Sequence, residues 1–367
     1  MKHFGTLYLF EWKKLLGKRI VWISFLLVLL MLAIAVFSPL FGGYYIDGKY
    51  MGTTYEMHQT DRAYAKTLNG RKIDQNLLEE TIEAYRKIPK DLDIHYMATD
   101  EYQKYARPYS EIFVFLRQMT GMMTSELMYS WEPDENDLSA KRRAYLLSYW
   151  KEQRLSAGEV EFWSSLENQI KTPYIYQEHG GYNIIFSCYQ GIGFFMLMLI
   201  GISFSVLSAF LLFAFYALCA FCLYGAEGFG AAYQFRDALC SDPLSCGQAL
   251  LIDLFLLLIV AVFVSIFVMV LSELLQSGTA TLAVSAGLLL LSIIVRVPQQ
   301  YRVPAQIWNW LPWSFLAPLN VFGNYTLCVF GHYFTPWQAV PVLYLAAGVA
   351  IAALGKPVYQ RFQVSGR

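Results

Sequence analysis

The chain has 367 residues, of which 56% are hydrophobic and only 15% are charged. Because soluble proteins carry about one quarter charged residues, this composition argues against a soluble protein. The 28 basic and 28 acidic residues cancel, so the total charge indicates no particular partner, and the distribution of charge is more informative. We expect no nucleic-acid partner.

The apolar residues are gathered in blocks that are long enough to cross a bilayer, since ~20 helical residues span its hydrocarbon core. The block 183–225 holds 43 residues without a charge, which is enough for two crossings, and we place the break near Ser203–Ser208. The expected crossings are 20–41, 184–204, 207–225, 249–271, 279–296 and 336–355. An alternative keeps 183–225 as one long bent helix and makes part of 306–330 a crossing. A cleaved signal peptide is the alternative to a retained first helix.

The charges indicate an orientation. A basic cluster directly precedes the first apolar block, and we take its members as candidate interfacial and orientation residues: Trp12, Lys13, Lys14, Lys18 and Arg19. The segment after that block, 42–180, has 22 acidic and 17 basic residues. Basic residues beside membrane helices stay in the cytoplasm, so we expect both termini to be cytoplasmic in the plasma membrane. The cluster also suits an amphipathic helix lying on the lipid bilayer, or a plain extension of the first helix.

The predicted fold class is an all-α integral membrane protein with about six transmembrane helices and a large, mainly helical extracytoplasmic insert between helices 1 and 2. The expected organisation is an interfacial helix at 1–19, a first crossing at 20–41, the insert at 42–182, a transmembrane domain at 183–355 and a cytoplasmic tail at 356–367. Within the insert, 109–131 reads as one helical run. Further helices are expected after the caps Asp74, Asp137 and Ser156, the last forming a capping box with Glu159.

No segment predicts an enzyme, a metal site or a cofactor site. The Cys219-x-x-Cys222 pair lacks the further ligands that structural zinc needs, and the acidic run 132–137 reads as a solvated loop that caps the next helix. The triplet Lys141–Arg143 reads as a solvated face or a lipid contact. Asp253 is the one ionisable residue well inside an expected crossing, and we expect it to snorkel to the interface near a helix start.

Several stretches together resemble the permease subunits of bacterial ATP-binding-cassette exporters, the type-2 membrane family. They are LFEWKKLLGKRIVWISFLL (9–27), YIDGKYMGTTYEM (45–57) with LNGRKID (68–74), YQGIGFFMLMLIGI (189–202), FVMVLSELLQSGTATLAVSAGLLLL (267–291) and the tail YQRFQV (359–364). The resemblance covers most of the chain. It implies an exporter subunit that moves a substrate outward with energy from a separate ATPase subunit, paired with a second permease copy or a homologous permease.

The resemblance also implies a tight cytoplasmic turn between two helices, with Ser272, Glu273, Gln276 and Ser277 as candidate ATPase-coupling residues. The chain itself has no G-x-x-x-x-G-K-[ST] loop, so ATP is expected to bind to the partner and no cofactor to this chain. Two alternatives stay open: a non-transporting membrane protein whose ectodomain binds or scaffolds at the cell surface, and an impaired permease copy.

One segment departs from the family pattern. Relatives have a short polar loop after the helix that corresponds to 191–202, with an acidic residue, a Gly-Thr pair and a basic residue. Here 203–226 has no charge, and 227–248 lacks that order. We hypothesise that 203–250 derives from a shifted reading frame or a deletion. The coding DNA tests this, because the hypothesis fails if no alternative frame encodes the missing loop.

Overall fold

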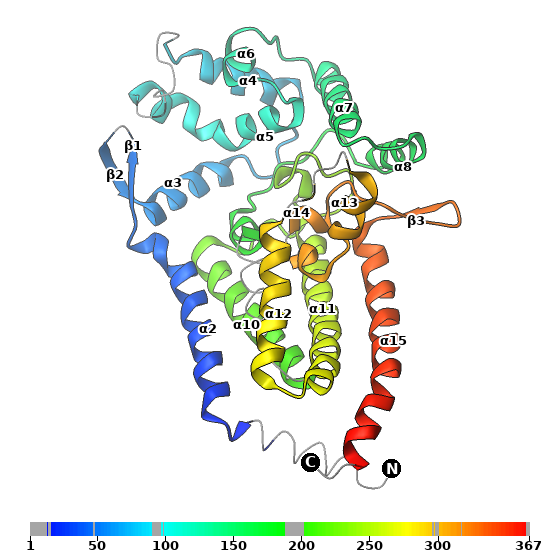
Figure 1. Cartoon of the computed structure of the whole chain (residues 1–367). Helices are drawn as coiled ribbons and strands as arrows, with labels where there is room; N and C mark the ends of the chain where they lie inside the picture. Colours follow the sequence, from blue (N-terminus) through cyan, green and yellow to red (C-terminus); the bar gives the residue numbers. More distant parts are fainter. Residues whose placement is uncertain are drawn as a thin grey trace.

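The computed structural model (Figure 1) describes residue 13 and the ranges 16–46, 48–89, 97, 99–187, 202–295, 297, 301–316 and 318–364. Most of these residues are helical. In this described part of the chain, four helices are long and apolar enough to cross a membrane, within Val21–Leu40, Val206–Tyr224, Cys246–Leu275 and Pro336–Pro357. The chain is therefore a helical multi-pass membrane protein, as its composition predicts.

Five long helices lie side by side and form the lower half of Figure 1. They are α2 (Arg19–Phe37), α10 (Ile202–Tyr224), α11 (Cys246–Leu275), α12 (Gly278–Ile294) and α15 (Pro336–Val364). Helix α11 is central, because it packs against α10, α12 and α15, while α2 packs against α10. Their outward faces are apolar too: Leu30 on α2 is 60% exposed. A helix that is hydrophobic all round needs an apolar surrounding, which lipid supplies.

A second group of helices lies across one end of this bundle (Figure 1). We call this group the insert, and the bundle end that it covers the insert end. Its helices are α3 (Thr54–Thr67), α4 (Gln75–Arg86), α5 (Ser110–Thr120), α6 (Thr124–Tyr129), α7 (Glu135–Glu152) and α8 (Ala157–Glu167), with short turns at Ser38–Leu40, Tyr102–Ala106 and Arg107–Tyr109.

Two helix starts of the insert agree with the sequence. Asp74 caps α4 by accepting the Leu77 amide at 3.2 Å. Ser156 and Glu159 form the predicted capping box of α8, in which each side chain accepts a backbone amide of the other residue. Such caps satisfy amides that have no partner inside the helix, and each contributes about 1 kcal/mol.

Two other expectations for the insert are wrong. The run 109–131 is divided into α5 and α6 because Gly121 adopts φ 68°, a left-handed conformation that ends α5 and that glycine adopts without strain. Helix α7 starts earlier than expected: Asp134 caps it, whereas Asp137 accepts the Trp131 indole N–H at 2.8 Å. The acidic loop at 132–134 does, as predicted, provide the cap of the next helix.

Among the described residues, the sheet structure consists of two hairpins. The sequence did not predict either of them. β1 (Gly43–Ile46) pairs antiparallel with β2 (Lys49–Thr53) directly after α2. β3 (Leu327–Val329) pairs with β4 (His332–Phe334) directly before α15. Both turns place a glycine at positive φ, Gly48 and Gly331, which is the backbone conformation that two-residue hairpin turns require.

The block 183–225 folds back on itself. A helical segment at 180–187 lies beside the end of α10, since the Tyr216 hydroxyl donates to the Ile184 carbonyl at 3.3 Å. A Cβ at Gly181 would overlap the Gly225 carbonyl, so the backbones touch there. In one continuous helix, Ile184 and Tyr216 would lie about 48 Å apart. The single bent helix is therefore wrong, and so is the break at 203–208, which lies inside α10.

The stretch between α12 and α15 is a compact cover at the insert end. It holds α13 (Arg302–Asn309), α14 (Pro318–Val321), the turn Pro312–Leu316 and the β3–β4 hairpin. Among the residues described here, no helix is long enough to span a bilayer, so the alternative crossing within 306–330 is wrong. The prolines of this stretch agree with its short helices, because a proline inside a helix interrupts it.

Candidate functional site

The α11–α12 turn contains the candidate coupling residues. Gln276 adopts φ 50° and its amide donates to the Ser272 carbonyl at 2.9 Å, which ends α11. Ser277 then caps α12, its hydroxyl accepting the Ala280 amide at 3.3 Å. Only two residues separate the helices, so the turn is tight and both of its residues are exposed. Glu273 lies in the last turn of α11 and is half-buried.

The basic residues at the start of the chain lie toward the same end. Lys18 is the residue before α2, and Arg19 begins that helix. The Trp22 indole donates to the Leu16 carbonyl at 2.7 Å, which holds the chain entering α2. Lys13 is exposed, whereas Trp12 and Lys14 lie outside the described residues. Figure 1 shows the start of α2 and the end of α15 at the end of the bundle where the α11–α12 turn lies. We call it the turn end.

The opposite, insert end is joined to the bundle by charged side chains. Arg62 of α3 lies 2.5 Å from Glu227 and 3.5 Å from the buried Glu178, and Lys66 lies 2.8 Å from Glu227. Lys66 and Arg62 lower the pKa of Glu227 to about 2, because their hydrogen bonds favour the carboxylate. Gln59 adds a bond to the Leu223 carbonyl at 2.9 Å. The end of α10 is therefore tied to α3.

The segment 225–245, which follows α10, lies against the insert. The guanidinium of Arg142 on α7 donates to the carbonyls of Ala238 and Cys240, and it binds both oxygens of Glu167 at 2.5 and 3.0 Å. Arg142 is only 4% exposed. The expectation of a solvated or lipid-facing triplet at 141–143 is therefore wrong for its central residue.

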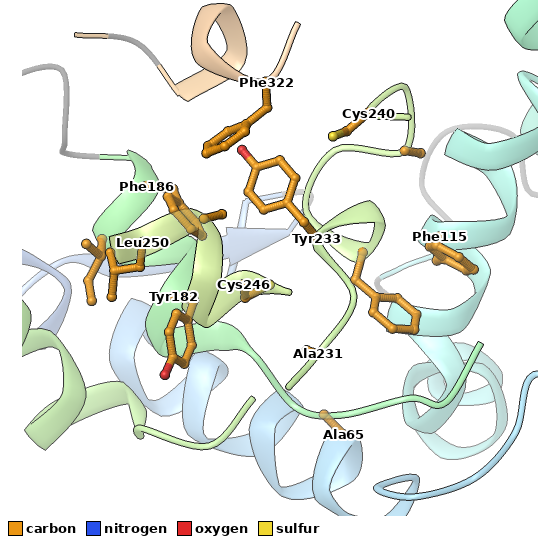
Figure 2. Packing of buried hydrophobic residues seen from close by; sticks show 14 of the residues in the cluster. Ala65, Phe115, Tyr182, Phe186, Ala231, Tyr233, Cys240, Cys246, Leu250 and Phe322 are labelled. Carbon is orange, nitrogen blue, oxygen red and sulfur yellow. The ribbon is translucent and has the colours of Figure 1, made fainter. Parts of the chain in front are cut away.

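Aromatic packing fills the centre of this junction. Figure 2 shows the Tyr233 ring between Phe186 and Phe322, with ring centroids 5.4 and 4.7 Å away. These three residues come from the segments 225–245, 180–187 and 301–334. The insert end thus has one continuous core that includes the residues following α10.

Asp253 belongs to this core and not to the interface. Helix α11 starts at Cys246, three residues earlier than expected, so Asp253 lies two turns inside it. Its side chain is 0% exposed. Burial raises the pKa of the Tyr233 phenol, and the Asp253 carboxyl adds to this effect. The expected snorkelling to the headgroups is wrong, because the loop 225–245 covers the start of α11.

No cluster of metal-ligating side chains occurs among the described residues. The burial of Arg142 could have been predicted from helical spacing. Arg142 lies four residues from both Leu138 and Leu146, which are buried, and positions four apart share a helix face. Comparisons of the chain with protein-family models, with curated proteins and with solved structures find no match.

Proposed function

We propose that this chain is the membrane-spanning permease subunit of an exporter driven by a separate ATP-binding-cassette ATPase. The observation that supports the proposal best is the separation of the two ends. The start of α2 with Lys18 and Arg19, the α11–α12 turn and the end of α15 share the turn end, and the charged insert covers the other end (Figure 1). With the positive-inside rule, the turn end is cytoplasmic and the insert lies outside the plasma membrane.

Under this proposal the chain crosses the membrane six times, and an even number of crossings leaves both termini on the cytoplasmic side. Helices α2, α10, α11 and α15 are long and apolar enough for four of these crossings. Helix α12, which is the shortest of the five long helices and packs against α11, is assigned the fifth. The sixth is the expected crossing that precedes α10.

The surface offered to an ATPase is small under this proposal. It consists of residues 1–19, the turn with Ser272, Glu273, Gln276 and Ser277, and the tail 356–367. Because the family's usual polar loop is missing, the coupling contact is assigned to these elements. Glu273 is the one charged residue in 272–278, so it suits a basic groove on the partner.

The test is recovery of the ATPase with a tagged permease. A surface ion pair contributes only ~0–1 kcal/mol, so Glu273→Ala has little effect, whereas Glu273→Lys adds repulsion and weakens binding up to about tenfold, the equivalent of ~1.4 kcal/mol. Deletion of 1–19 removes the second contact and lowers recovery further. Glu126→Lys, an exposed change on α6, is the matched control.

If recovery of the ATPase is unchanged with both Glu273→Lys and the deletion of 1–19, the proposed coupling surface is wrong. Absence of any co-purifying ATPase favours the second candidate, a membrane protein whose ectodomain binds or scaffolds at the cell surface. The observation favouring that candidate is the insert itself, which has its own helices and is fixed to the bundle by the Arg62, Glu178 and Glu227 contacts.

A further inference from the structure

A cavity of about 610 Å³ lies where α8, α13, the β3–β4 hairpin and α15 meet. Its volume falls within the roughly 300–1,000 Å³ of small-molecule sites. The described lining residues come from four separate parts of the chain, three of them within the last sixty residues. Neither the proposed coupling surface nor the ion pairs at the insert end include any of them.

The cavity extends from the insert into the depth of the expected bilayer. Leu343 lines it and lies seven residues inside α15, whose candidate span starts at Pro336. At 1.5 Å per residue, this places Leu343 about 10 Å along the span from its insert-side start. Ser156 and Glu159 line the opposite wall and belong to α8 of the insert. One wall is therefore at water level and the other at lipid level.

The wall at water level is polar and preorganised. The Glu159 carboxylate accepts the Ser156 amide at 2.7 Å and hydroxyl at 2.6 Å, and the Thr326 hydroxyl at 2.8 Å. These bonds join α8 to the segment before β3. A Cβ at Gly158 would overlap the Tyr333 hydroxyl, so the side chain of Tyr333 from β4 lies directly on the backbone of α8. The carboxylate is the charged group among the described lining residues, and none of them is basic.

The wall at lipid level is apolar and opens outward. Ile307 of α13 lines the cavity and is 64% exposed. Val303, one turn earlier, has a similar exposure, so α13 presents an apolar face away from the protein. Trp310 lines the cavity between the two walls, and its carbonyl accepts the Tyr344 hydroxyl of α15 at 2.8 Å. Tryptophan is typical of the membrane interface because its ring is apolar and its N–H is polar.

We propose that this cavity binds a single-chain amphiphile with a primary ammonium head, which enters sideways from the outer leaflet. The tail lies along Ile307 and Leu343. The ammonium group lies near Glu159, Tyr333 and Trp310, where a carboxylate and two aromatic rings favour a cation. An anionic head is disfavoured, since the described lining offers it a carboxylate and no basic group. The assignment is independent of any ATPase partner.

Cys328 provides a native reporter, because it lines the cavity and its side chain is exposed. The purified full-length protein in phosphatidylcholine nanodiscs is treated with N-ethylmaleimide, and the rate of Cys328 modification is followed by peptide mass spectrometry. Dodecylamine should slow this rate about tenfold, which corresponds to ~1.4 kcal/mol. Dodecanoate, which has the same tail length and an anionic head, and ethylamine, which lacks the tail, should leave it unchanged.

Matched variants separate cavity binding from a general effect on the bilayer. Leu343→Trp fills the cavity and should abolish the protection, whereas Leu345→Trp, on an exposed α15 position outside the lining, should keep it. Glu159→Gln keeps a capping-box residue type and should reduce the protection, while Glu161→Gln on the exposed face of α8 should not. The melting temperature of each variant shows that it is folded.

Three results overturn the assignment: no protection of the wild type by dodecylamine, equal protection by dodecanoate, or protection that persists in Leu343→Trp. Protection by ethylamine, which has no tail, would show that the cavity binds the ammonium group without a tail. This result would also overturn the proposal that the ligand is an amphiphile. The Cys328 modification assay contains no ATPase, so its outcome does not depend on recovery of the ATPase with the tagged permease. A negative result in the Cys328 assay likewise leaves the proposed coupling surface unaffected.

Discussion

The most specific structural claim about the insert concerns Arg142, and it leads to a quantitative prediction. This side chain joins three elements, because its guanidinium binds Glu167 of α8 and the carbonyls of Ala238 and Cys240 while Arg142 itself is on α7. Arg142→Met keeps most of the apolar stem and removes every one of these bonds. The neighbouring Arg143 is exposed and makes one bond, to Asn168 at 3.0 Å, so Arg143→Met is the matched control.

The magnitude follows from the burial. Removing one partner of a buried ion pair costs about 3–5 kcal/mol, because the other charge stays buried without its partner. Glu167 retains 15% side-chain exposure, so relaxation toward water places the expected loss near the lower value, about 3 kcal/mol. A change at an exposed position such as Arg143 stays within about 0.5 kcal/mol.

Trypsin provides the assay, since Arg236 lies in the segment that Arg142 holds. A loss of about 3 kcal/mol raises the population of the opened segment roughly a hundredfold, because each 1.4 kcal/mol is a factor of ten. Cleavage after Arg236 in the detergent-purified protein should accelerate accordingly in Arg142→Met and remain at the wild-type rate in Arg143→Met. Equal cleavage rates for the two variants would refute the buried ion pair.

Two further predictions concern the same end of the molecule. A protease site inserted at the exposed Gly230 should be cut in intact cells if the segment 225–245 lies outside, and protection from cutting would contradict that placement. Burial lowers the pKa of His179, so the unfolded chain binds a proton below pH ~6.5 that the folded chain resists. The melting temperature should therefore fall between pH 7.5 and 5.5, and the fall should be smaller in His179→Phe; an unchanged fall in that variant would contradict this cause.

The sequence predicts the helical membrane class and most helix positions because those depend on local composition. Apolar blocks with at most one charge mark α2, α10, α11, α12 and α15, and side-chain caps mark the starts of α4 and α8. Such signals are contained in short stretches of sequence. Helix α15 continues to Val364, nine residues beyond the expected crossing, so most of the expected tail 356–367 is helical. The turn that the resemblance implies at 272–277 does lie between two helices, but it is limited to 276–277, because Ser272 and Glu273 belong to α11.

Contacts between distant segments account for the rest. Arg142 and Asp253 carry charge, and charge alone indicates solvent or headgroups; their burial follows from the loop 225–245, which covers both of them. The cavity beside Glu159 has walls from α8 and from residues far later in the chain, as the Glu159–Thr326 bond across 167 positions shows. No local pattern indicates that such segments meet. The two hairpins were missed because each strand has only three to five residues.

The orientation of the chain is the claim on which the proposed function depends most. Single cysteines at Asn136 on α7, at Ser277 in the α11–α12 turn and at Ser365 in the tail test it in intact cells with a membrane-impermeant maleimide. Mass spectrometry of each labelled peptide distinguishes these sites from the native cysteines. The account predicts labelling of Asn136→Cys and protection of Ser277→Cys and Ser365→Cys until the membrane is opened. The reverse pattern, or labelling of the turn together with the insert, would contradict it.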